Sequence, residues 1–246
     1  MERTYRALPW RRVTNPPRLR TLTGAMGRCL ILVLGSTLST VCYALTIRAS
    51  LGLGPLFVAQ DGLAHMAGIA IGTAVMAVGV ALIVVALLLG AKLGPGTLVL
   101  PFLSGATLDL LLPHIPEVHG LGLRLFVVII STWFMALGGS LIIRAALGAA
   151  AYDTVMLGLH GLFRRRRIAS IRAAMELTML ICGWLMGGAV GIGTVLTAAL
   201  IGPAMQFWLR GFATNAPSST WLRLLPAHRA QLVSQDVADV SDVSAR

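Results

Sequence analysis

Acidic residues lie within or beside long apolar stretches of this chain, where an ionised side chain is costly unless it has a partner or faces a cavity. They are Asp61, Asp109, Asp153 and Glu176. In an apolar surrounding, such carboxylates commonly bind a proton, a cation or a positively charged group of a ligand. We therefore take three of them as candidate substrate-binding residues, together with three arginines: Asp61, Asp153, Glu176, Arg48, Arg144 and Arg172.

Arg172 stands four positions before Glu176, so the two side chains share one face of a helix and can pair. The same face continues through Gly183 and Gly187, a GxxxG spacing that lets a neighbouring helix approach closely. Two interpretations stay open. The pair is either a neutralised part of a helix-packing seam, or Glu176 lines a central cavity and binds a proton or a cation.

Arg48 and Arg144 occupy matched places in an internal repeat. The segment IRASLGLGP at 47–55 returns as IRAALGAAA at 143–151, and GPGT at 94–97 matches GIGT at 191–194. Each copy is roughly 85 residues long, and such periodicity dominates the interpretation of a fold. Each arginine either anchors a helix end at the lipid headgroups, or the two meet near a pseudo-two-fold axis and hold an anionic substrate.

Glycines concentrate in the turns of both copies. Glycine adopts backbone conformations that other residues avoid, and helix breaks at matched positions of two repeats are a sequence indicator of a transporter binding site. The candidate turn residues are Gly52, Gly54, Gly94, Gly96, Gly148, Gly191 and Gly193.

Signals for catalysis are missing from the sequence. It contains neither an HExxH zinc motif nor a GxSxG nucleophile elbow. The three cysteines, Cys29, Cys42 and Cys182, form no CxxC pair and predict neither a disulfide framework nor a zinc site. We expect a protein that is not an enzyme, with no catalytic residue, no metal and no cofactor.

The composition indicates a membrane protein. Of 246 residues, 57% are hydrophobic and only 12% are charged, against about 25% charged in soluble domains. Apolar runs near 20 residues recur, which is the length of a membrane-spanning helix. The net charge is +11. Many of the basic residues that carry it flank the apolar runs, as in the block 164–167, and no aromatic residue lies within that block. This placement favours a lipid bilayer as partner over nucleic acid and leaves the oligomeric state open.

The predicted fold is an all-α polytopic membrane protein with two tandem repeats at 28–113 and 124–210. A disordered basic cytoplasmic tail at 1–27 and a disordered cytoplasmic tail at 211–246 flank them. The segments 49–68 and 145–163 are short and interrupted, which favours re-entrant segments. The six predicted spans are 29–47, 69–91, 97–112, 125–143, 173–190 and 194–209.

Charge placement sets the predicted topology. With three spans in each copy and a cytoplasmic N-terminus, the block 164–167 and Lys92 are cytoplasmic, both termini are cytoplasmic, and the copies run in opposite directions. An eight-span alternative, in which both short segments cross, makes the copies parallel. Lys92 and Arg144 favour six spans, and Arg124 favours eight.

Several motifs together resemble the YczE-like membrane proteins, relatives of the YitT group. In the first half these are RAxLGLGP at 48–55, DGL at 61–63 and GT at 72–73. In the second half they are Glu176, GWLxGG at 183–188, VGIGT at 190–194 and GP at 202–203. The similarity covers about residues 28–210. It implies a multi-pass protein of the bacterial inner membrane whose molecular activity is largely unassigned.

The chain departs from that family at the two turns. The family tends to follow its first Gly-Pro turn with Trp-Asp, where this chain has Leu56-Phe57, and its second turn favours Gly-Pro-Arg-Asp, where this chain has AAYD at 150–153. Of the acids that these turns would carry, Asp153 alone is kept.

Two functions fit these observations. The first is a small-molecule or ion transporter, or a permease subunit, with a midplane cavity lined by Arg48, Arg144, Asp153 and Glu176. The alternative is a non-transporting membrane protein that scaffolds or regulates partner proteins, for which we expect a tightly packed interior with those groups facing the headgroups.

Overall fold

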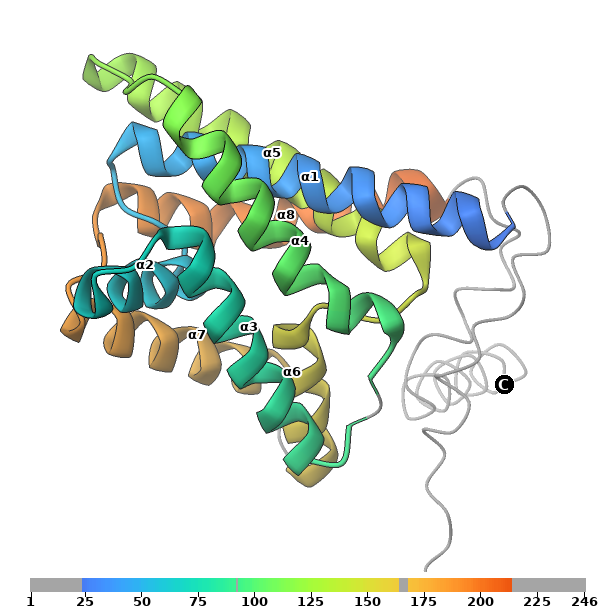
Figure 1. Cartoon of the computed structure of the whole chain (residues 1–246). Helices are drawn as coiled ribbons and strands as arrows, with labels where there is room; N and C mark the ends of the chain where they lie inside the picture. The colour runs from blue at the N-terminus through green and yellow to red at the C-terminus, as the bar shows by residue number, and fades with distance from the viewer. Residues whose placement is uncertain (1–23, 92, 164–167, 214–246) are drawn as a thin grey trace, which may run out of the picture. The chain divides into compact units, whose positions relative to one another are not determined.

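The computed structural model describes residues 24–91, 93–163 and 168–213 (Figure 1). Most of the two predicted tails, Lys92 and the basic block 164–167 lie outside the described residues. Residues Thr23–Trp208 form one compact unit, to which the following description refers. Among the described residues the regular structure is helical throughout.

Eight α-helices follow one another along the described chain. They are α1 (Ala25–Ala49), α2 (Pro55–Ala67), α3 (Ile71–Leu88), α4 (Pro95–Leu111), α5 (Leu121–Ala145), α6 (Ala151–Leu162), α7 (Ile168–Leu185) and α8 (Ile192–Ala213), and a 3-10 turn, η2 (Leu112–His114), follows α4. All except α2 and α6 are long and apolar enough to cross a membrane. α2 and α6 have 13 and 12 residues, which reach only about 20 Å. The predicted set of six span-length helices is therefore confirmed.

The bounds of all six spans differ from the prediction by up to about five residues, and α8 continues to Ala213, into the segment predicted as a disordered tail. Three of these differences change the interpretation. α1 begins at Ala25 rather than at 29. The third span is not as short as predicted, because α4 continues into η2 and gives a stretch of 20 residues, Pro95–His114. α7 starts five residues earlier than predicted and ends at Leu185, so Gly187 (φ +90°) lies in the following turn. The proposed GxxxG face through Gly187 is therefore wrong.

The helices repeat with the period found in the sequence. A shift of 96 positions carries α1 onto the bounds of α5, and a shift of 97 carries α3 onto the bounds of α7. The residues that end α1 and α5 also match, because Ser50 and Ala146 both adopt the left-handed conformation, with φ of 51° and 52°. A non-glycine residue rarely adopts this conformation, so its recurrence marks the same turn in both copies.

α1 and α5 pack side by side and antiparallel (Figure 1). Near the start of α1, Arg28 donates hydrogen bonds to the carbonyls of Ala145 (3.0 Å) and Ala146 (2.8 Å) at the end of α5. Midway, a Cβ on Gly35 would lie 2.8 Å from the carbonyl oxygen of Gly138. Small residues here bring the two backbones together, as is common between helices in lipid.

The short helices pack across the repeats. α2 lies against α7 of the other copy, and α6 lies against α3. The α2–α7 contact is close, because a Cβ on Gly62 would collide with the carbonyl of Gly183. Large apolar side chains such as Leu88 of α3, Leu185 of α7 and Val195 of α8 are exposed, as expected for surfaces that face hydrocarbon.

Candidate functional site

The glycine turns of the two copies bind each other reciprocally. The backbone N–H of Gly193 donates to the carbonyl of Leu51 over 2.7 Å, and the matched N–H of Gly96 donates to the carbonyl of Leu147 over 2.9 Å. Each turn thus satisfies backbone groups at the start of a long helix in the other copy. These candidate turn residues contact protein backbone, which assigns them a structural role in joining the copies.

Close approach explains the remaining glycines. Gly52 and Gly148 have φ of 101° and 132°, and a Cβ on either would strike the opposite turn, at Gly191 or near Gly94. Gly54 precedes α2 in an extended conformation and packs against Thr197.

Arg48 and Arg144 do not converge. Arg48 lies at the C-terminal end of α1, where it donates to the carbonyl of Leu112 and its own carbonyl accepts the N–H of Val118. Arg144 lies at the end of α5 that contacts Arg28. Because the helices are antiparallel, the two arginines are about 30 Å apart along the helix axis. The hypothesis that both hold one anionic substrate is therefore wrong.

Asp61 fixes a turn on another helix. It is buried, with 4% of its surface exposed, and its carboxylate accepts the backbone N–H of Ala189 over 2.8 Å. Exposed His65 lies 3.6 Å from the other carboxylate oxygen. Asp61 thus contacts the turn after α7, about 20 Å along that helix from Arg172, and does not join the other candidates.

Asp109 has a structural role that the sequence did not reveal. Its carboxylate accepts the backbone N–H of Gly72 (2.7 Å) and the hydroxyl of Thr73 (3.3 Å) in the first turn of α3. A negative charge at this position is stabilised by the unpaired N–H groups and the dipole of the helix.

The remaining candidates come together between α6 and α7. Arg172 and Glu176 pair over 2.9 Å on α7, and both side chains are about one-third exposed. Asp153 lies in the first turn of α6 and interacts electrostatically with Arg172. The neighbouring Tyr152 interacts with the charges of Asp153, Arg172 and Glu176. We call Tyr152, Asp153, Arg172 and Glu176 the polar cluster.

Burial governs the ionisation of the cluster residues on α6. It raises the pKa of Asp153 above the usual aspartate value, and the positive charge of Arg172 offsets only part of that effect. Burial, followed by the negative charge of Glu176, raises the pKa of Tyr152 to about 12. Tyr152 is therefore a neutral hydroxyl near pH 7, and its buried oxygen has no hydrogen-bond partner among the described residues.

The cluster belongs to one copy of the repeat. At the matched positions of the first copy stand Leu56, Phe57, Val75 and Gly79. In the first copy, apolar residues at these positions are sufficient for the helices to pack. Four polar groups in the second copy thus indicate a site that packing does not require.

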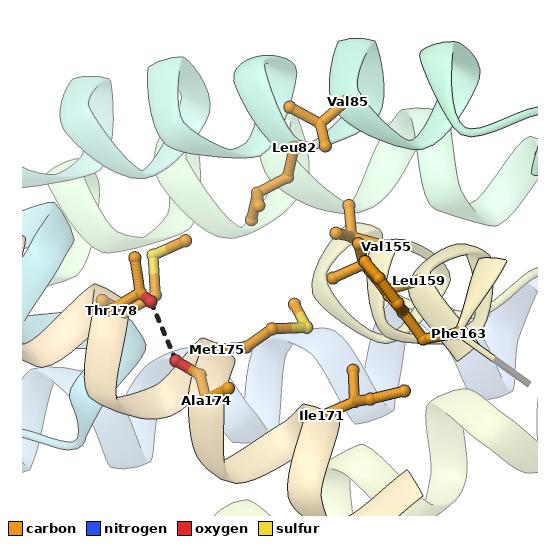
Figure 2. Close-up of a pocket in the computed structure, with 10 residues that line it drawn as sticks. Leu82, Val85, Val155, Leu159, Phe163, Ile171, Ala174, Met175 and Thr178 are labelled. Atoms are coloured by element: carbon orange, nitrogen blue, oxygen red, sulfur yellow. Dashed lines mark hydrogen bonds between the residues drawn. The ribbon is translucent and has the colours of Figure 1, made fainter. Parts of the chain in front are cut away.

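An apolar pocket of about 360 Å³ lies nearby. Tyr152 packs against the apolar cluster that contains its lining residues Val155, Ile171 and Met175. Figure 2 shows that the walls of the pocket come from α3, α6 and α7, with Leu82, Val155 and Met175 among the lining side chains. It is not the predicted midplane cavity lined by both arginines. Among the described residues, no group of three or more His, Cys, Asp or Glu side chains could hold a metal ion.

Sequence reasoning missed Tyr152 and Arg28. The one signal for Tyr152 was its place next to Asp153 in the departure from the family pattern. Arg28 directly precedes the first predicted span, yet its guanidinium caps α5, 117 positions away. Local sequence carries no sign of that contact.

Comparisons with known proteins agree with a membrane location. An uncharacterised protein of Haemophilus influenzae is 31% identical over 169 residues, which cover 67% of this chain and 75% of that protein. The uncharacterised membrane protein YczE of Bacillus subtilis is 37% identical over 75 residues, which cover 29% of this chain and 33% of YczE. No solved structure matches the chain.

The similarity to YczE confirms the resemblance found in the motifs. Together with the six span-length helices, it identifies a multi-pass integral membrane protein. A family model described as "Family of unknown function (DUF6198)" matches residues 26–210. Since this match covers most of the sequence, the chain belongs to that family of unknown function.

Proposed function

We propose that this protein is a small-molecule or ion transporter whose coupling site is the polar cluster. The observation that carries the proposal is Asp153, an acid enclosed between two helices whose charge Arg172 offsets only in part. Intramembrane and half-buried carboxylates of this kind serve as proton and cation sites in many transporters.

The charge of the cluster can change by one proton. With Asp153 ionised, Asp153, Arg172 and Glu176 sum to a formal charge of −1. With Asp153 protonated, the Arg172–Glu176 ion pair leaves the cluster neutral. Release of the proton thus creates a site for a positive charge, and binding of a positive charge favours release of the proton, which is the reciprocity that coupling requires.

Helix packing supports an inverted repeat with six spans. The antiparallel packing of α1 and α5 is what opposite orientations of the two copies require. Eight spans would make these helices parallel. The charges of Lys92 and the block 164–167 support cytoplasmic termini in a bacterial inner membrane. In this orientation the polar cluster faces the cytoplasmic half, because Arg172 follows the basic block by five positions.

One observation favours the alternative, a non-transporting protein that scaffolds or regulates partners. The long helices α1 and α5 contact each other directly through Gly35 and Gly138, and Arg48 and Arg144 lie at helix ends rather than around a central cavity. A protein of this kind has no need to move a proton through the α6–α7 cluster.

Electrical recording on proteoliposomes separates the two functions. Purified protein adsorbed on a solid-supported membrane is exposed to a pH step. Proton binding alone gives only a brief displacement of charge, so the current scored is the slower one that coupled movement into the liposomes produces. We expect a current with the native protein, its loss in Asp153→Asn, and its retention in Glu117→Gln, which removes an exposed connector acid. Currents equal to those of protein-free liposomes, or unchanged in Asp153→Asn, would favour the non-transporting function.

A further inference from the structure

The pocket beside the polar cluster is apolar on all its walls. Val155 and Leu159 come from α6, Leu82 comes from α3, and Ile171 and Met175 come from α7 (Figure 2). The hydroxyl of Thr178, the polar side-chain group in the lining, donates to the carbonyl of Ala174 over 2.8 Å. It is therefore already satisfied within its own helix. A cavity with these walls accepts hydrocarbon rather than a polar molecule.

The pocket arises from a difference between the repeats. In the first copy, Gly62 of α2 meets Gly183 of α7, and the two backbones touch. In the matched pair, Gly158 of α6 faces Leu89 beyond the end of α3, and a Cβ on Gly158 would lie 3.0 Å from that side chain. Bulkier neighbours hold α6 away from α3, so space remains on this side.

The pocket and the polar cluster are continuous along α7. Ile171 and Met175 line the pocket, and Arg172 and Glu176 directly follow them in the sequence. Positions 172, 175, 176 and 179 form one stripe on a helix, because residues three and four apart are neighbours. Tyr152 packs against the same apolar side chains from α6. The charged groups do not themselves line the pocket, so the head of a bound molecule extends past Tyr152 to reach them.

We propose that this site binds an amphipathic organic cation, with its hydrocarbon chain in the pocket and its positive head at Asp153 and Glu176. The inference rests on the proposed transport function and names its substrate class. Two acids against one arginine select a positive head group, and the unpartnered hydroxyl of Tyr152 offers it a further oxygen acceptor. An anionic head would meet two carboxylates and is disfavoured.

A series of probes with one chain and different heads tests the head-group preference. Decyltrimethylammonium, decanol and decanesulfonate are compared below their micellar concentrations, as displacers of radiolabelled decyltrimethylammonium from protein in lipid nanodiscs. Binding to empty nanodiscs is subtracted. We expect the cation to bind about tenfold more tightly than the alcohol and the sulfonate to bind most weakly. Equal binding of all three would overturn the inference.

Matched variants test the location. Ala174→Phe fills the pocket from its exposed rim, whereas Ala173→Phe makes the same change at an exposed neighbour that does not line it. We expect Ala174→Phe to weaken decyltrimethylammonium binding about tenfold and Ala173→Phe to leave it unchanged. Asp153→Asn and Glu176→Gln should each reduce the preference for the cation over decanol. Equal losses in the two phenylalanine variants, or a preference that neither polar substitution alters, would contradict the site.

The pH-step currents distinguish failure of this inference from failure of the transport function. Currents that depend on Asp153, without selective binding of the decyl cation, would overturn the substrate class and leave the transporter intact. Selective binding without such currents would support the site and overturn transport.

Discussion

Arg172 and Glu176 form an ion pair over 2.9 Å one turn apart on α7, at the positions where α3, the matched helix of the other copy, has Val75 and Gly79. Gly79 allows Pro101 of α4 to pack closely on α3. In the second copy, charged side chains stand at the positions that match Val75 and Gly79. The matched helices thus differ, with a close packing contact at Gly79 of α3 and an ion pair on α7.

The enclosed acid should make stability depend on pH. Burial raises the folded-state pKa of Asp153 above its ordinary value of 3.8, so the folded protein binds more protons than the unfolded chain between these two values. This contribution to stability is fully present below the ordinary value and is lost as the pH rises through the folded-state pKa. The Asp153→Asn variant has no carboxyl group at this position, so it does not lose this stability as the pH rises.

We therefore expect Asp153→Asn to melt at a higher temperature than the native protein at neutral pH. The difference should shrink towards pH 4. Thermal denaturation in detergent across this range measures it, with Glu117→Gln as the control for a general change of charge. A difference that grows as the pH falls would contradict the account.

The glycine turns that join the copies should tolerate no side chain. Gly52→Ala and Gly148→Ala each place a Cβ against the opposite turn at a positive φ. We expect each to destabilise the protein by about 2 kcal/mol, through backbone strain and overpacking. Gly122→Ala, whose Cβ meets nothing within 4 Å, should be neutral in the same thermal assay. Similar melting of all three variants would contradict the contact between the turns.

Arg28 should stabilise the antiparallel pair of α1 and α5. Its guanidinium satisfies two carbonyls at the end of α5, where a positive charge is also favoured by the helix dipole. We expect Arg28→Gln to cost about 1.5 kcal/mol, and Arg28→Lys, which keeps the charge without the two-pronged geometry, to cost less. An equal loss in both variants would assign the effect to geometry alone.

The inverted topology can be tested by labelling in intact cells. In a background without native cysteines, single cysteines replace Lys92, Arg164 and Glu117. We expect a membrane-impermeant thiol reagent added outside to label position 117, and to label 92 and 164 after the membrane is opened. Outside labelling at 92 would make the repeats parallel and contradict the six-span topology.

The sequence was a good guide wherever the signal is local. Apolar runs predicted the six spans, and the repeated turns predicted that α1 and α5 end alike at Ser50 and Ala146. The pairing of Arg172 with Glu176 was also accessible, because four positions on a helix define a neighbour.

Contacts between distant segments were not accessible. Asp61 binds Ala189, 128 positions away, and Asp109 caps a helix 37 positions away. The separation of Arg48 from Arg144 follows from the direct side-by-side packing of α1 and α5. The predicted inverted repeat implied their opposite directions but not this contact. The neighbourhood of Tyr152 likewise depends on how α6 lies against α7.

We propose that Asp153 takes up and releases a proton inside the polar cluster, which has no counterpart in the first copy. Infrared titration of the protein in lipid measures this directly through the carbonyl stretching band of a protonated carboxyl group. We expect a band that is missing in Asp153→Asn, is kept in Glu117→Gln, and titrates with a midpoint above the ordinary aspartate value of 3.8. A spectrum unchanged in Asp153→Asn, or a midpoint at the ordinary value, would contradict the claim.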